Sequence, residues 1–103
     1  MQRRRAEGEP EEVFAEMQGR LRAVGAELRL VDPMSISLLF EFEVTDRGPP
    51  TMFFLAVVPA DGGGSNIALA RKRKGVRSDF RAMVVGEDDP IETRVLDLLM
   101  RAP

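Results

Sequence analysis

The sequence predicts an α+β domain: an N-terminal helix, an antiparallel meander of about four strands, and a C-terminal helix. Apolar residues recur at helical spacing near both ends of the chain and alternate with polar residues in its middle. Turns rich in Gly and Pro separate the alternating segments. We expect the helices to pack on one face of the sheet. A chain of 103 residues is the right length for one such domain.

Residues 1–9 are predicted to be a disordered, charged lead-in, and residues 10–103 a single interaction domain. The lead-in has almost no apolar surface to bury. The first helix should begin at Pro10, which a first helical turn tolerates, and the two glutamates after it suit the positive end of the helix dipole. Gly25 is typical of the end of a helix. The apolar stripe of this helix consists of Val13, Phe14, Met17, Leu21 and Val24.

Period-two alternation predicts the strands. A short strand covers residues 28–32, and a longer one runs over residues 35–45. The buried face of the longer strand is expected to consist of Ile36, Leu38, Phe40, Phe42 and Val44. A turn at residues 46–50 leads to a returning strand at 52–58, so this pair should form a hairpin. After a glycine-rich turn, residues 67–71 form the last strand of the meander.

Two further elements follow the meander. Residues 78–85 fit a helix that begins at Ser78 and fit a strand as well, and the spacing of their apolar residues favours the helix. The final helix should begin at Pro90, with Asp89 as N-cap and Glu92 as its capping-box partner. The apolar stripe of this helix consists of Ile91, Val95, Leu98 and Leu99.

The composition removes most catalytic chemistry. The chain has no Cys and no His, which excludes disulfides, thiolate metal sites, nucleophilic thiols and serine–histidine relays. Glu41 and Glu43 share one face of a strand, where a solvated position explains them better than an acid–base pair. The glycine-rich turn lacks the Gly-Lys-Ser/Thr of a phosphate-binding loop. We therefore predict a protein that is not an enzyme, with no cofactor and no metal site.

Charge is distributed unevenly along the chain. The formal net charge is −2, yet residues 66–85 contain six basic residues and a single acid. This basic cluster is predicted to bind an anionic ligand, and its residues are Arg71, Lys72, Arg73, Lys74, Arg77 and Arg81. Each basic residue near an anionic lipid surface contributes about 1 kcal/mol. The ordinary alternative is a solvated sheet edge whose charges prevent aggregation.

Lipid or an acidic protein surface ranks above nucleic acid as the ligand of this cluster. Proteins that bind single strands usually present exposed aromatic platforms, whereas this chain has no Trp or Tyr and its six Phe lie on core-like stripes. The longest apolar run, residues 52–59, is far shorter than the roughly 20 residues of a membrane span. We predict a cytoplasmic protein, with a nuclear or peripheral-membrane location left open.

Part of the sequence resembles a known family. The features are a helix end at residues 21–25, an apolar strand at 52–57, and an alternating strand at 67–71 followed by Gly75 and an acid-Phe-Arg step at residues 79–81. This pattern is similar to the kinase-associated domain at the C-terminal tail of checkpoint-type and MARK/AMPK-related serine/threonine kinases. The resemblance implies a non-catalytic regulatory module that binds acidic phospholipids through the basic cluster. It also implies a parent kinase domain as partner, which the module restrains.

The order of helix, meander and helix also resembles the RWD-like domains of kinetochore and adaptor proteins. That resemblance implies a protein–protein contact, either heterodimerisation or adaptor binding. The apolar residues of the central hairpin discriminate the two interpretations. An exposed patch of several hundred Å² there would favour protein binding, and a covered hairpin beside a prominent basic end would favour lipid binding. The diagnostic side chains are Leu39, Phe53, Leu55 and Val57.

Overall fold

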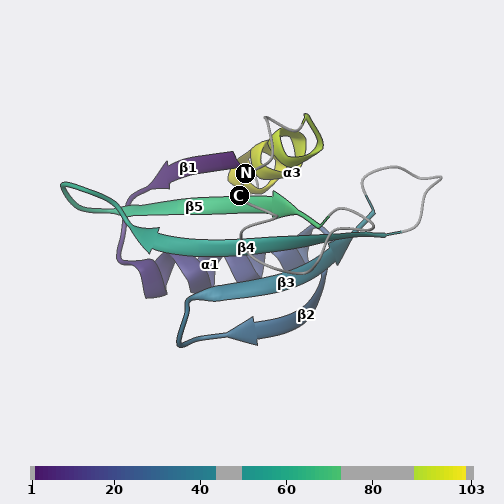
Figure 1. Cartoon of the computed structure of the whole chain (residues 1–103), viewed down its shortest axis with the longest axis horizontal. Coiled ribbons are helices and arrows are strands. Elements are labelled where there is room, and N and C mark those ends of the chain that lie inside the picture. Colours follow the sequence, from purple (N-terminus) through teal and green to yellow (C-terminus); the bar gives the residue numbers. More distant parts are fainter. Residues whose placement is uncertain (1, 44–49, 73–89, 102–103) are drawn as a thin grey trace.

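A computed structural model of the chain describes residues 2–43, 50–72 and 90–101, and it has the predicted α+β architecture (Figure 1). Five strands form one antiparallel sheet in the order β1-β5-β4-β3-β2. In chain order the elements are β1 (Gln2–Ala6), α1 (Pro10–Ala23), β2 (Glu27–Asp32), β3 (Ser37–Phe42), β4 (Thr51–Pro59), β5 (Ser65–Arg71) and α3 (Pro90–Arg101).

The helices and the central strands lie where the sequence predicts them. Helix α1 begins at Pro10, and Gly25 follows its end with a φ of 86°, a conformation that glycine adopts without steric cost. Helix α3 begins at Pro90. The residues predicted at 78–85, the Asp89 cap and Val44 lie outside the described part of the chain.

The first residues differ from the expectation of a disordered lead-in. Residues Gln2–Ala6 form β1, an edge strand paired with β5, from Gln2 opposite Leu69 to Ala6 opposite Ser65. Within the described residues the sheet therefore has five strands, where the sequence suggested about four. Backbone hydrogen bonds make this pairing, so it does not require the apolar alternation on which the prediction of strands relied.

Strand β3 begins two residues later than expected because a turn occupies residues 33–36. Asp32 holds this turn, since its carboxylate accepts hydrogen bonds from the Met34 amide (3.1 Å) and the Ser35 hydroxyl (2.8 Å). The Ser35 hydroxyl bond is the main cause of a lowered pKa at Asp32. Ile36 closes the turn with a φ of 52°, unusual for a β-branched residue, while its side chain packs against the core.

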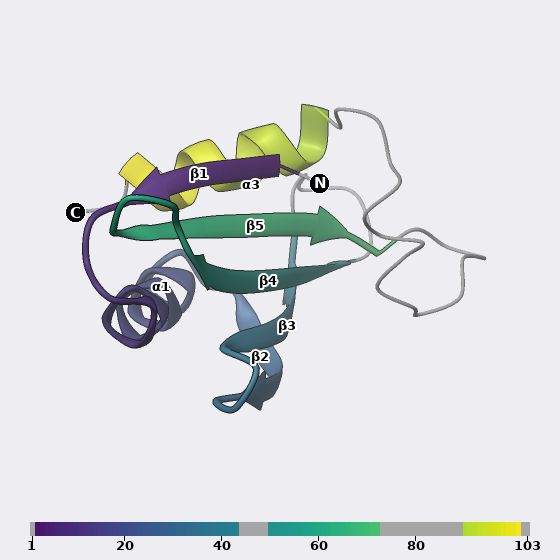
Figure 2. The same cartoon turned by 60° about the vertical axis from the view of Figure 1, so that its left-hand side comes forward.

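The core lies on one face of the sheet. Phe40 on β3 and Phe53 on β4 are fully buried and stack with ring centroids 5.2 Å apart. Both helices pack against this face, and Arg20 of α1 donates to the carbonyls of Leu99 (2.8 Å) and Met100 (3.2 Å) at the end of α3. Figure 2 shows α3 lying along β1 and α1 against the other strands. The inner strand residues are Leu38, Phe40, Phe53, Leu55, Val57, Ile67 and Leu69.

The opposite face carries no described helix. Strand alternation places Leu39, Phe54, Ala56 and Ala68 there, between the two edge strands. This side is called the helix-free face below. It matters because Arg3 and Arg5 of one edge strand and Leu30 of the other project onto it.

Phe40→Ala should lower the free energy of unfolding by about 3–5 kcal/mol, because it removes a stacked, fully buried ring. Chemical denaturation followed by circular dichroism measures the loss. Leu98→Ala is the control, since the Leu98 side chain is 41% exposed on α3. Equal losses in the two variants would contradict the assigned inner face.

Candidate anion-binding surface

Strand β1 places three consecutive arginines beside the end of β5. The pairing is antiparallel, so the start of β1 lies next to the C-terminal half of β5, opposite Ala68 and Leu69. The basic cluster predicted from the sequence begins at Arg71, only a few residues further along β5. Cations far apart in the sequence therefore lie at the same side of the sheet.

Alternation along β1 separates these arginines. Arg4 faces the helices, opposite Ile67, and its guanidinium forms an ion pair with Asp97 of α3. Arg3 and Arg5 lie opposite Ala68 and Asn66, on the helix-free face, and both are exposed. Arg4 thus anchors β1 to α3, while its two neighbours present their charges to solvent.

The β4–β5 turn fixes the other end of β1. The Arg5 Nη2 donates to the carbonyl of Gly63 (2.9 Å), and the Ser65 hydroxyl donates to the carbonyl of Gly8 (2.8 Å). Gly64 has a φ of 78°, and a Cβ there would lie 2.9 Å from the carbonyl oxygen of Ala6. The glycine-rich run is therefore a turn, as the sequence predicts, that also packs closely against β1.

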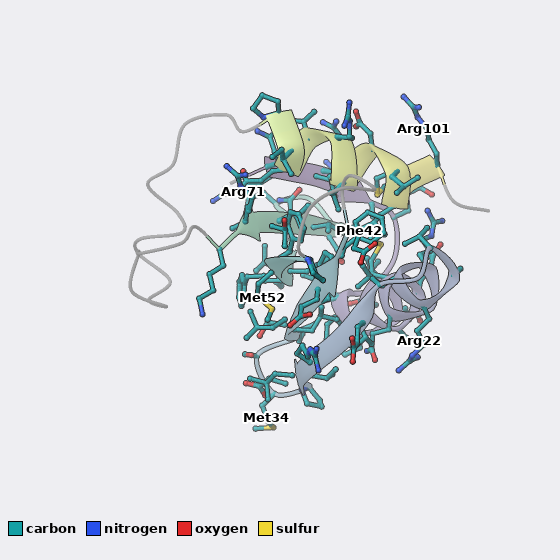
Figure 3. All side chains as sticks on the ribbon, turned by 90° about the vertical axis from the view of Figure 1, so that its right-hand side faces the viewer. Arg22, Met34, Phe42, Met52, Arg71 and Arg101 are labelled. Atoms are coloured by element: carbon teal, nitrogen blue, oxygen red, sulfur yellow. The ribbon has the colours of Figure 1, made fainter. Side chains whose placement is uncertain are left out.

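Arg71 faces the helices rather than solvent. It pairs with Phe53 of the inner face and is half-buried beneath the first turn of α3 (Figure 3). Its backbone amide donates to the carboxylate of Glu92 (2.6 Å), which is only 4% exposed. Glu92 therefore joins α3 to β5, a contact that the sequence did not predict. We do not place Arg71 among the ligand-binding cations.

Lys72 is exposed, and strand alternation directs it to the side opposite that of Arg71. Its amide donates to the carbonyl of Met52 (2.8 Å), which fixes the backbone at this position. The other predicted cations, Arg73, Lys74, Arg77 and Arg81, lie outside the described residues. The cationic surface, as the structure describes it, consists of Arg3, Arg5 and Lys72.

The charges of the two sheet edges differ. Within residues 2–43, 50–72 and 90–101, none of the three cations of the cationic surface forms an ion pair. At the other edge, Arg29 is held by Glu41 (3.1 Å) and Glu27 (3.2 Å), and these carboxylates raise the pKa of Arg29. The β1 edge therefore carries cations that form no ion pair among the described residues, whereas the arginine of the β2 edge is already paired with two carboxylates.

The central hairpin is largely covered. Phe53, Leu55 and Val57 are at most 1% exposed, and Leu39 is half-buried. Three of the four diagnostic side chains therefore belong to the core and contribute nothing to an exposed apolar patch. On the hairpin itself, Val58 of β4 is exposed, and the other exposed large apolar side chains among the described residues are Leu30, Val31, Met34 and Leu98.

Other candidate sites carry little chemistry. Glu41 bonds to Arg29, so it is not poised as half of an acid–base pair with Glu43. A hollow of about 680 Å³ along α3 contains Asp97, whose carboxylate pairs with Arg4. Among the described residues, no group of three or more Asp or Glu could hold a metal ion.

Sequence reasoning missed Arg3 and Arg5. The sequence identified these two residues only as charged, and no local pattern of apolar residues indicated a strand. Arg4 faces the helices, and an apolar residue at this position would have shown the alternation that is typical of a strand. Its partner Asp97 is 93 positions away, so no local pattern indicated the ion pair.

Comparison with protein-family models gave no match, and comparison with curated proteins gave no relative. In the part of the chain that the structure describes, no helix has the length and apolar character needed to cross a bilayer.

Gly64→Ala should destabilise the domain and release β1, because the added Cβ meets the Ala6 carbonyl at 2.9 Å. Gly62→Ala is the matched control, since Gly62 has a similar φ of 81° and nothing within 4 Å of an added Cβ. The measurement is amide hydrogen exchange of residues 2–6, which reports local opening. Equal exchange in both variants would show that the close approach does not hold β1.

Proposed function

We propose that this domain is a non-catalytic regulatory module that binds anionic phospholipid through the cationic surface. The observation that supports it best is the pairing of β1 with β5, which brings Arg3 and Arg5 beside the C-terminal half of the strand that leads to Lys72. Arg3, Arg5 and Lys72 form no ion pair with an acidic residue in the part of the chain that the structure describes. Their charge is therefore available to an external anion.

The expected energy suits a reversible membrane contact. At about 1 kcal/mol per basic residue near an anionic surface, three cations supply roughly 3 kcal/mol, or about two orders of magnitude in affinity. Salt screens such an attraction over a Debye length of about 10 Å at 0.1 M. The anionic leaflet that offers this ligand faces the cytoplasm, which agrees with the location predicted from the sequence.

The resemblance to the kinase-associated domain supports the same proposal. It implies acidic phospholipid as ligand and a parent kinase domain as the partner that the module restrains. An acidic patch on that kinase domain would meet the same cations, so membrane binding and kinase restraint would compete. The RWD-like alternative, a protein–protein contact, draws support from the exposed apolar side chains of β2 and the turn after it.

The test is co-sedimentation with vesicles that contain or lack phosphatidylserine, at about 50 and 200 mM salt. The triple variant Arg3→Gln, Arg5→Gln and Lys72→Gln should bind anionic vesicles about 100-fold more weakly than the unmodified chain. The control triple Arg22→Gln, Arg94→Gln and Arg101→Gln removes the same charge from exposed positions on the helices, and it should retain most of the affinity.

Two results would contradict the proposal. Equal losses in the two triple variants would mean that net charge alone governs binding. No binding of the unmodified chain at the lower salt would leave the cationic surface as a solvated edge. Thermal unfolding of all three proteins checks that the substitutions leave the fold intact.

A further inference from the structure

Strand β2 forms the second edge of the sheet. Among the described residues it pairs with β3 alone, so alternate peptide groups along its outer side face solvent. Its side chains are unusually apolar for such a position. Leu30 is 61% exposed, Val31 is 37% exposed, and Met34 in the turn that follows is 94% exposed. Figure 3 shows Met34 at the far end of the turn between β2 and β3.

The charged side chains of Arg29 and Asp32 already form contacts within the domain. Arg29 is bonded to Glu41 and Glu27, and the Asp32 carboxylate is bonded to Ser35 and Met34. What β2 offers to a partner is therefore peptide groups and apolar side chains, because Arg29 and the Asp32 carboxylate are held by contacts within the domain. The β1 edge is different, because exposed arginines such as those of β1 discourage strand addition.

We propose that β2 pairs antiparallel with β2 of a second copy of this chain, about a two-fold axis at Leu30. A two-fold axis perpendicular to the sheet keeps the helix-free faces of both copies on the same side. Leu30 projects onto this face, because it pairs with Leu39 of β3. In this register Leu30 lies opposite Leu30 of the second copy, and Arg29 lies opposite Val31 of the second copy. No two like charges therefore lie directly opposite each other.

The geometry predicts a closed dimer of modest affinity. Within the described residues, β2 is the sheet edge without exposed unpaired cations. A two-fold contact uses this edge in both copies, so association stops at two copies and does not continue into a filament. The register shift between Leu28 and Leu30 limits how much of β2 can pair regularly. So short an interface lies at the weak end of specific contacts, and a dissociation constant on the order of 100 µM is expected.

Sedimentation equilibrium of the whole chain tests the proposal. The weight-average mass should rise from 11.5 kDa toward twice that value between about 10 µM and 1 mM. Leu30→Lys places two like charges opposite each other at the axis and should weaken the dimer at least tenfold. Val58→Lys is the matched control, since Val58 is also an exposed residue of the helix-free face, on β4 and away from the edge.

A second experiment fixes the register and does not depend on the stability of the lysine variant. The chain has no cysteine, so Leu30→Cys creates a single thiol whose Cβ lies roughly 5 Å from its symmetry mate, near disulfide range. Under the same oxidant it should form disulfide dimers at least tenfold faster than Val58→Cys. A chain that stays monomeric to 1 mM, or equal cross-linking rates for the two cysteines, would overturn the proposal. Neither outcome bears on vesicle binding, which the cationic surface tests separately.

Discussion

The antiparallel pairing of β1 with β5 is the interaction on which the rest of this molecule depends. It adds the first residues of the chain to the sheet and brings their arginines to the edge where β5 ends. Helix α3 contacts both strands. Asp97 forms an ion pair with Arg4 of β1, and the Glu92 carboxylate accepts a hydrogen bond from the Arg71 amide of β5. Without this pairing, the arginines of β1 and Lys72 would be separate local charges with no common surface.

The second organising feature is the one-sided core. Because both helices cover the same face, side chains of alternate strand positions gather on the helix-free face, where Arg3 and Arg5 lie at one edge and Leu30 at the other. The two proposals use these opposite edges. A coplanar dimer through β2 would turn both cationic surfaces to the same side, and two such surfaces on one membrane would bind with an avidity that neither has alone.

Sequence patterns predicted the elements whose apolar residues repeat regularly. Helix α1, the β3–β4 hairpin and α3 lie where the periods of 3.6 and 2 placed them, because burial against one core sets those periods. Strand β1 lacked that signal, since backbone pairing and a contact between Arg4 and Asp97 hold it in place. Arg71 was predicted as a ligand-binding cation, yet strand alternation turns it toward α3, an orientation that depends on a register the sequence does not encode locally.

The most direct test of this account is to map the lipid contact by nuclear magnetic resonance. Amide resonances of the labelled chain would be followed during titration with nanodiscs containing phosphatidylserine, and with nanodiscs of phosphatidylcholine alone. The account predicts changes at residues 2–6 and at Lys72 with the anionic nanodiscs only. Changes centred on β2, or the same changes with both nanodiscs, would contradict a charge-based contact at the β1 edge.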